Sequence, residues 1–388
     1  MALKASRRGT VPPFIVMDVM RAANRRQAEG GDVLHLELGQ PATGAPSGVL
    51  DAARTALERD QLGYTEAFGL EPLRRRIAAH YQATQNVAVD PERIVITTGS
   101  SGGFVLAFLA AFDAGDRVAL ADPGYPAYRN ILLALGVQPV MLPTGPGTRF
   151  QPTPELLDAI DGPIDGLIVA SPSNPAGTMI GEAEMRALVE WCHAHGVRLI
   201  SDEIYHGITY GRPAVSALRF GNEAVVINSF SKYFSMTGWR IGWMAVPDDL
   251  LRSVECLAQN LYISPPTLSQ HAAMAVFDCT AELDANVARY ARNRELLLRD
   301  LPLAGFDRLA PADGAFYLYA DVANLTNDSE DFCRRMLAET GVATTPGIDF
   351  DRTRGRAWIR ISFSGDTEQI AEAVRRMARW TGRGGQGT

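Results

Sequence analysis

The stretch SFSKYFSMTGWR, residues 229–240, directly follows the apolar run AVVIN at residues 224–228. Such a run is typical of a buried strand, and in sheets of alternating strands and helices ligands bind where strands end. Lys232 is therefore expected beside a binding site. Lys4 is the only other lysine, so 35 of the 37 basic residues are arginines. A lysine removed from water can lose its proton and form a Schiff base, which arginine cannot do, so any amine chemistry is expected at Lys232.

Groups that bind anions surround Lys232 in the same stretch. Ser229 and Ser231 supply hydroxyl donors, and Arg240, eight residues after the lysine, can reach an anion beside the amine. Together they point to an aldehyde cofactor that carries a phosphate. The alternative is a single surface lysine left by chance in an arginine-rich chain, which does not explain its place between an apolar strand and a turn.

Length and composition indicate an ordinary globular protein of about two domains. The chain has 388 residues, of which 46% are apolar and 21% charged, with a net charge of -7. The negative charge and the lack of a basic run argue against a nucleic-acid surface. The longest unbroken apolar segment, residues 104–112, is too short to span a bilayer, and the N-terminal residues do not resemble a secretory signal. We therefore expect a cytoplasmic protein with no nucleic-acid or membrane partner.

The four cysteines show no spacing typical of a disulfide framework, so reduced thiols are expected. Cys192, His193 and His195 cluster at the end of a predicted helix. The two histidines are two positions apart and point to different faces, so no metal site is predicted.

Strands and helices alternate along the middle of the chain. Strands are predicted at residues 93–97, 117–121, 137–142, 166–170 and 198–201, and helices at residues 12–30, 47–59, 70–84, 102–112, 127–135 and 181–195. This alternation predicts an α/β fold with a mostly parallel central sheet covered by helices on both faces.

Residues able to bind a ligand follow these predicted strands. The loop GSSGG at residues 99–103 presents Ser100, Ser101 and Gly102 between a strand and a helix, where amide N–H groups and hydroxyls suit a phosphate. Gly39 can let its backbone approach a ligand closely, although an ordinary turn glycine is equally consistent. The other strand ends supply a flat ring, an amide, an acid and a phenol: Tyr125, Asn174, Asp202 and Tyr205.

Beyond Val246 the pattern changes to long helices followed by a second set of strands. Helices are predicted at residues 248–260, 281–301 and 366–380, and strands at residues 306–309, 315–320 and 358–362. We expect a large domain of residues 46–275 and a smaller α+β domain of residues 1–45 together with 276–388, of which 382–388 form a loose tail.

Two further residues are candidates for contacts with small molecules. Alternation along the predicted strand at residues 358–362 places Arg360 on the opposite face from Ile359 and Ile361. Its guanidinium can clamp a carboxylate there or face solvent, and spacing alone does not separate these alternatives. Tyr64 lies in a loop bounded by glycines, where it is either a contact or ordinary loop packing.

With these residues in view, the whole chain resembles the class I/II aminotransferases, pyridoxal-phosphate enzymes of fold type I. The resemblance rests on SPSNPAG at residues 171–177, DEIY at residues 202–205 and SFSK at residues 229–232 with Arg240, in the family's order and at similar separations. It implies a homodimeric transferase of amino acid metabolism that uses pyridoxal 5'-phosphate.

The resemblance also implies a role for each candidate residue. Lys232 holds the cofactor as a Schiff base and moves the Cα proton, while Asp202 pairs with the protonated pyridine nitrogen. Asn174 and Tyr205 bind the phenolic oxygen, and Tyr125 stacks on the ring. The phosphate is held by Ser100, Ser101, Gly102, Ser229 and Arg240, joined by Tyr64 from a second subunit. The substrate α-carboxylate is held by Arg360 with Gly39 and Asn174.

The implied reaction exchanges an amino group between an L-amino acid and a 2-oxo acid by a ping-pong mechanism through aldimine and ketimine forms. Aspartate-specific relatives often bring a second arginine a few residues before a Ser/Asn-Pro-Pro turn. Here that segment is QNLYISPP, residues 259–266, which has no cation. We therefore expect a neutral or apolar amino acid on one side of the reaction, with glutamate, alanine or aspartate as donor.

Three alternatives remain open at the level of sequence. Lyases, decarboxylases and synthases of the same fold share the cofactor geometry. A serine hydrolase would use Ser101 as nucleophile, with Asp202 and His271 downstream in the required order. His271 lies in what looks like a helix interior, however, and that reading leaves Lys232 without a role. A non-catalytic regulator that binds the cofactor is the third alternative.

Overall fold

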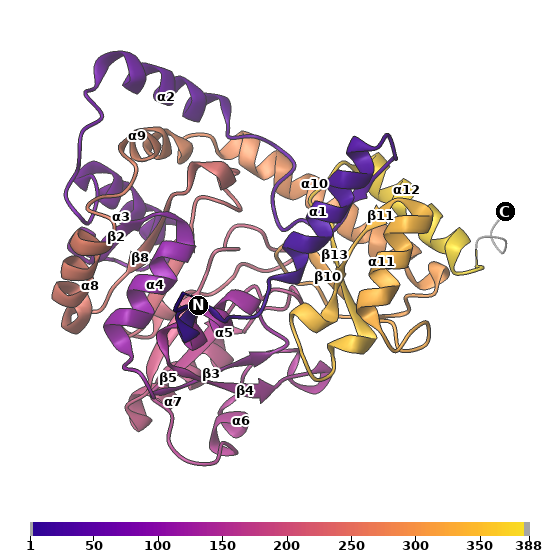
Figure 1. The fold of residues 1–388 in the computed structure, drawn as a ribbon. Helices are drawn as coiled ribbons and strands as arrows, with labels where there is room; N and C mark the ends of the chain where they lie inside the picture. Colours follow the sequence, from indigo (N-terminus) through magenta and orange to yellow (C-terminus); the bar gives the residue numbers. More distant parts are fainter. Residues whose placement is uncertain (1–2, 384–388) are drawn as a thin grey trace.

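The computed structural model describes residues 3–383, and its larger part is built on a seven-stranded sheet (Figure 1). The strand order is β2-β8-β7-β6-β5-β3-β4. All neighbours are parallel except β8, which is antiparallel to both β2 and β7. The strands are β2 (Ile94–Thr97), β3 (Arg117–Asp122), β4 (Gln138–Pro143), β5 (Gly166–Ala170), β6 (Arg198–Asp202), β7 (Val225–Ser229) and β8 (Gly242–Ala245). The predicted α/β fold with a mostly parallel sheet is confirmed.

Helices cover both faces of this sheet because its strands are apolar on both sides. In β7, Val226 packs into one core cluster, whereas Val225 and Ile227 pack into another on the opposite face. The helices of this part are α2 (Ser47–Arg59), α3 (Glu71–Gln85), α4 (Gly99–Ala111), α5 (Pro126–Leu135), α6 (Pro154–Asp158), α7 (Glu182–His195), α8 (Asp248–Leu261) and α9 (Thr267–Val276).

A second part carries a four-stranded antiparallel sheet with the order β12-β13-β10-β9. Its strands are β9 (Arg308–Leu309), β10 (Tyr317–Asp321), β12 (Thr345–Pro346) and β13 (Trp358–Ser362), and its helices are α10 (Thr280–Asp300), α11 (Ser329–Thr340) and α12 (Thr367–Trp380).

The N-terminal segment packs on this second part. Strand β1 (Leu34–His35) pairs in parallel with β11 (Val342–Ala343), and Figure 1 shows helix α1 (Ile15–Ala28) beside the orange and yellow C-terminal elements. The division into residues 46–275 and residues 1–45 with 276–388 stays a proposal, with which this pairing agrees.

Differences from the sequence prediction concern element boundaries and short elements. Helix α4 begins at Gly99 rather than Gly102, so the GSSGG loop forms its first turn. Strand β8, helix α11 and the short elements α6, β11 and β12 were not predicted from the sequence. Of the expected tail at residues 382–388, residues 384–388 lie outside the described part of the chain.

Neither a membrane span nor a metal site is found in residues 3–383. No helix there is long and apolar enough to cross a bilayer. No group of His, Cys, Asp and Glu in that range could hold a metal ion, and the four cysteines are free thiols.

Candidate active site

A cavity of about 290 Å³ lies where the strand ends of the seven-stranded sheet face the second part of the molecule. It brings together ten predicted site residues: Gly39, Ser100, Ser101, Tyr125, Asn174, Asp202, Tyr205, Lys232, Arg240 and Arg360. Three predicted residues, Tyr64, Gly102 and Ser229, do not line it. The lining has two sides. The sheet side lies at the strand ends of the large sheet and carries Ser100, Ser101, Tyr125, Asn174, Asp202, Tyr205, Ser231, Lys232 and Arg240. The α1 side comes from the N-terminal segment and consists of Phe14, Val16, Met17 and Met20.

The amine of Lys232 lies inside this cavity, in the turn that follows β7. Its Nζ donates a hydrogen bond to the carbonyl oxygen of Gly39 at 2.6 Å. Burial, aided by the positive charges of Arg360 and Arg240, lowers the pKa of Lys232 from 10.5 to about 8, although Asp202 opposes the shift. A useful fraction of this amine is therefore neutral and nucleophilic near neutral pH.

Asp202, the last residue of β6, presents a buried carboxylate to the cavity. Tyr128 donates its hydroxyl to Oδ2, and the backbone N–H of Ile204 donates to Oδ1 at 3.1 Å. Burial raises the pKa of Asp202 to about 6, against the lowering effect of these two hydrogen bonds. No ion pair to this carboxylate is found among residues 3–383. A cationic ring nitrogen in the cavity would supply the missing positive charge.

Tyr205 and Tyr317 contact each other in the cavity, and the hydroxyl of Tyr317 lies against Gly39. Their hydroxyl oxygens are 2.8 Å apart, and both side chains are buried. A Cβ on residue 39 would collide with the hydroxyl of Tyr317, so glycine is favoured there by close approach rather than by its backbone angles. Tyr317 lies on β10 and was not predicted as a site residue, because no motif marks it.

Arg360 faces the cavity from β13, with Ile359 and Ile361 packed into the core on the other face. Its Nη1 donates to Oδ1 of Asn174 at 3.0 Å and its Nη2 to the carbonyl oxygen of Glu37 at 2.5 Å. Within the described chain its buried Nε has no hydrogen-bond partner. The guanidinium thus lies next to the amide of Asn174 with its Nε–H unused within the described chain, as a carboxylate-binding group would require.

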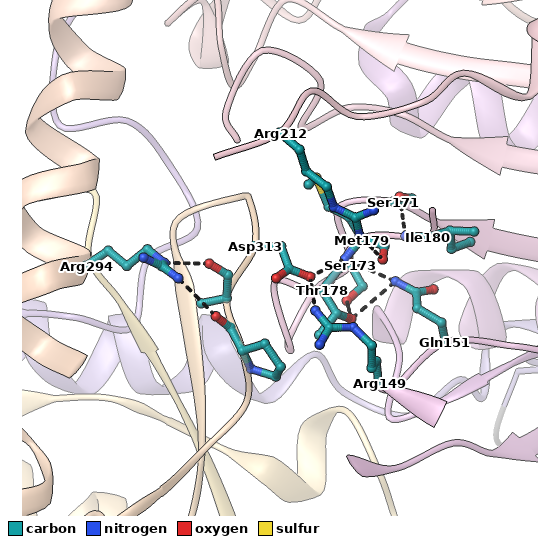
Figure 2. Close-up of polar contacts among 12 residues, drawn as sticks. Arg149, Gln151, Ser171, Ser173, Thr178, Met179, Ile180, Arg212, Arg294 and Asp313 are labelled. Carbon is teal, nitrogen blue, oxygen red and sulfur yellow. Dashed lines mark hydrogen bonds and ion pairs between the residues drawn. The ribbon is translucent and has the colours of Figure 1, made fainter. Parts of the chain in front are cut away.

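The loop that carries Asn174 is fixed by contacts from several segments (Figure 2). The side-chain amide of Gln151 donates to the carbonyl oxygen of Thr178 at 2.9 Å. Asp313, from the second part of the molecule, accepts from the N–H of Met179 at 3.1 Å and from Arg149 at 2.6 Å. These contacts hold the loop against both parts and so orient Asn174 toward Arg360.

Groups that could hold an anion come together where Arg240 meets the N-terminal end of α4. A Cβ on Gly99 would lie 2.5 Å from Nη2 of Arg240, so the guanidinium packs directly on the first turn of the helix. Ser100 and Ser101 of that turn line the cavity, and the free N–H groups and dipole of a helix end favour an anion.

The serine hydroxyls beside Lys232 are arranged differently from the sequence-based expectation. Ser229 donates to Oγ of Ser231 at 2.9 Å and is buried away from the cavity, whereas Ser231 and Thr237 line it. Gly102 is buried beneath the side chain of Thr98. Direct binding of a ligand by Ser229 or Gly102 stays a prediction.

Tyr64 lies outside the cavity of its own chain and is 82% exposed. Its expected contact with the phosphate is not made within its own chain, and a contact made from a second subunit stays a prediction.

The α1 side of the cavity was not predicted from the sequence at all. It consists of Phe14, Val16, Met17 and Met20 from the N-terminal segment and α1. The helical pattern of residues 12–30 predicted the helix but gave no signal of where it packs. This side is apolar, in contrast to the charged and hydroxyl-bearing sheet side.

The arrangement required for a serine hydrolase is not found. His271 lies on α9 with its Nδ1 4.0 Å from Asp60, and the described residues show no hydrogen bond between it and Ser101. His193, at the end of α7, pairs with Glu223 at 2.7 Å on the surface.

Comparison with known proteins connects this cavity to one family. The family model for aminotransferases of class I and II matches residues 31–377. The valine–pyruvate aminotransferase of Mycobacterium tuberculosis is 57% identical over 377 residues, which cover 96% of this chain and 97% of that protein.

Solved structures agree with this match. An aminotransferase from Mycobacterium tuberculosis superposes with a TM-score of 0.97 at 56% identity, covering 98% of this chain and 100% of the other. The aspartate aminotransferase from Thermus thermophilus with maleate superposes with a TM-score of 0.92 at 30% identity, covering 97% and 100%.

Proposed function

The chain belongs to the class I and II aminotransferases and is an enzyme that transfers amino groups, and we propose that it binds pyridoxal 5'-phosphate and acts on a neutral, apolar L-amino acid. The observation that carries the proposal is the amine of Lys232 inside a cavity that also contains Asp202 and Arg360. Family membership favours amino transfer over the lyase, decarboxylase, hydrolase and regulator alternatives.

The described residues fit both ends of pyridoxal phosphate, its pyridine nitrogen and its phosphate. The buried carboxylate of Asp202, with no cation paired to it among residues 3–383, suits a protonated pyridine nitrogen. The first turn of α4 with Arg240 suits the phosphate. When bound, the cofactor supplies an aldehyde that reacts with amines and a ring that withdraws electrons from the substrate Cα.

The side chains of the cavity divide the remaining work. Lys232 would hold the cofactor through its amine and, once released, would take the proton from the substrate Cα and deliver a proton on the same face to the cofactor's aldehyde-derived carbon. Asp202 would keep a proton on the ring nitrogen, and Tyr205 and Asn174 would donate to the phenolic oxygen. Tyr125 would cover the ring, Ser100, Ser101, Gly102, Ser229 and Arg240 would hold the phosphate, and Arg360 with Gly39 and Asn174 would bind the α-carboxylate.

The chemistry of the cavity supports a neutral substrate. Among the described residues that line it, the cations are Lys232, Arg240 and Arg360, and each already has a role with the cofactor or the α-carboxylate. The substrate side chain would instead meet the apolar α1 side. With the relative named valine–pyruvate aminotransferase in view, we propose valine or a similar amino acid as donor and pyruvate as acceptor.

A homodimer is part of the proposal. Tyr64 is highly exposed on its own subunit, and its expected contact with the phosphate can only be made in a neighbouring subunit. A hybrid dimer of the Tyr64→Ala and Lys232→Ala variants tests this, because one of its two sites would combine an intact Lys232 with an intact Tyr64. Recovery of activity on mixing supports the dimer, and no recovery in verified hybrids contradicts it. The cytoplasmic location expected from the sequence stays a prediction.

A half-reaction screen tests the proposed substrate class. Purified holoenzyme is mixed with one amino acid at a time, and the 2-oxo acid released is measured, with the Lys232→Ala protein as control. We expect valine and alanine to react and aspartate and glutamate to react more slowly. A panel in which only dicarboxylates react would overturn the proposed substrate class while leaving the enzyme class intact.

A further inference from the structure

We propose that Asp349 is a positioning residue, which sets the selectivity of the cavity for apolar side chains by anchoring the first turn of α1. The inference takes its substrate from the proposed function. The anchoring itself is argued from the geometry of the buried carboxylate of Asp349. Asp349 touches neither the cavity nor Lys232 and acts through the residues of the α1 side.

Helix α1 begins without a local cap. Its N-cap residue is Phe14, whose side chain offers no acceptor, and the first N–H groups of any helix lack partners within the helix. Asp349 supplies them from a distant part of the chain. Its Oδ1 accepts from the N–H of Ile15 and its Oδ2 from the N–H of Val16, each at 3.1 Å.

This carboxylate is held in place by the second sheet. Asp349 is buried and ends the 3₁₀ turn Gly347–Asp349, which directly follows β12. Strand β12 pairs with β13 so that Thr345 lies opposite Arg360. A Cβ on Gly347 would lie 2.5 Å from the carbonyl oxygen of Trp358, so this turn is tightly packed against the start of β13. The anchor of α1 and the proposed carboxylate-binding arginine therefore share one rigid support.

Burial disfavours the ionised form of Asp349, and the groups around its carboxylate oppose that effect. The described residues 3–383 contain no ion pair to Asp349 within 4.0 Å, and burial raises its pKa. The two N–H donors oppose this shift, as do the more distant charges of Arg360 and Arg129, although the pKa stays above its usual value. A negative charge at a helix N-terminus is also stabilised by the helix dipole. The carboxylate thus gains its stabilisation from the helix that it anchors.

Apart from the anchor at its first turn, α1 buries few side chains against the rest of the protein. Of its 14 residues, only Val16 and Ala23 are buried, and Met17 is 45% exposed. Val16, which donates one of the anchoring N–H groups, itself lines the cavity, and Met17 and Met20 follow on the same face. Loss of the anchor would therefore loosen the apolar side of the cavity before it affected the sheet side.

The test compares Asp349→Ala and Asp349→Asn with a matched control, Asp18→Asn. Asp18 is also an acid at the first turn of α1, but its side chain is 52% exposed and pairs with Arg21 on the surface. The holoenzyme of each variant is assayed for kcat and KM with valine and with alanine. Hydrogen exchange of the amides of residues 15–20 is measured in parallel.

A lost helix cap corresponds to a change of about five- to tenfold in the population of the ordered first turn. We expect Asp349→Ala to raise KM for valine by about that factor and KM for alanine less than about twofold, with kcat for either changed less than KM. Exchange at Ile15 and Val16 should accelerate by a similar factor. Asp349→Asn, which keeps one acceptor oxygen, should fall between the two, and Asp18→Asn should match the wild type.

Two results would overturn the proposal. One is unchanged exchange at Ile15 and Val16 in both Asp349 variants, which would show that the carboxylate does not anchor the helix. The other is faster exchange with an unaltered ratio of valine to alanine activity, which would show an anchor without effect on selectivity. Should Asp349→Ala fail to fold, Asp349→Asn decides by the same two measures. A wild-type enzyme inactive with both amino acids would instead refute the proposed function, while the exchange data would still decide whether the anchor exists.

Discussion

The sheet side and the α1 side of the cavity are built in opposite ways. The sheet side takes its polar groups from residues at or shortly after the ends of strands of one sheet, such as Asp202 at the end of β6 and Lys232 in the turn after β7. The α1 side takes apolar groups from a helix whose anchor, Asp349, is more than 330 positions away in the chain. Under the proposed function this difference separates two tasks, because the groups proposed for the chemistry are marked by local motifs and those proposed to select the substrate depend on contacts between distant parts of the chain.

The strongest test of this separation is removal of the amine on the sheet side. Lys232→Ala should lower the rate of amino transfer by about 10⁴-fold, because no other described side chain of the cavity offers a neutral amine as nucleophile and base. Steady-state transfer from valine to a 2-oxo acid measures the loss. Lys4→Ala, which removes the exposed lysine, is the matched control and should retain full activity. Retention of more than about a tenth of the activity in Lys232→Ala would remove the basis for assigning chemistry to the sheet side.

Arg360 lies between the two sides, and its substitution shows how far the chemistry depends on binding. Arg360→Lys loses the planar, two-pronged donor that suits a carboxylate. We expect KM for every amino acid to rise by about 30- to 100-fold, irrespective of side chain, since the α-carboxylate is common to all. Arg356→Lys, at an exposed arginine four positions earlier, is the control. An increase confined to valine would instead place Arg360 in side-chain selection.

The shifted pKa of Lys232 gives a test on the cofactor-free protein. Burial lowers this pKa to about 8, so the fraction of neutral amine should grow about tenfold between pH 7 and pH 9. Reductive methylation followed by mass spectrometry should show labelling of Lys232 with a midpoint near pH 8. The exposed Lys4 provides an internal reference in the same sample. A midpoint at the ordinary lysine value of 10.5 would mean that the amine is not shielded from water.

The smallest expected effect concerns the α1 side alone. Met20→Ala widens the apolar part of the cavity and should lower the preference for valine over alanine by roughly fivefold, because a few methylene groups are worth about 1–3 kcal/mol of discrimination. The ratio of kcat/KM for the two amino acids measures it. Val19 on the same helix packs against Ala23 and Val33, away from the cavity. Val19→Ala should therefore leave that ratio unaltered. If the ratio of kcat/KM for valine to that for alanine were the same in Met20→Ala as in Val19→Ala, the proposed division of tasks between the two sides would be wrong.

The same contrast explains how far the sequence could predict the site. Asp202, Asn174, Lys232 and Arg240 were found because each follows a recognisable strand and motif, and the cavity does bring them together. Tyr317 was missed because its meeting with Gly39 depends on how two sheets pack. Both Ser229 and Ser231 are candidates from the sequence, and the resemblance names Ser229, because spacing does not show that Ser231 is the one whose side chain lines the cavity.

The fold itself was predicted more completely than the site. Apolar runs between helices predicted the parallel strands, since such runs are read from local pattern. Strand β8 was missed because it lies antiparallel between β2 and β7, and the regular alternation that marked the others is absent there. The pairing of β1 with β11 joins residues about 300 positions apart, which no local pattern reports.

That long-range pairing bears on the order in which the enzyme can mature. A ribosome makes the N-terminus first, yet Leu34 and His35 gain their strand partners only when Val342 and Ala343 have emerged. Contacts between residues so distant in the chain form late, because the entropy cost of closing a long loop comes before the contacts that offset it. The N-terminal segment, whose apolar side chains we propose select the substrate, is thus among the first parts of the chain to be translated and among the last to be paired. A polypeptide released before Val342 has emerged would contain Lys232, the proposed catalytic residue, but would lack the strand partner of this segment.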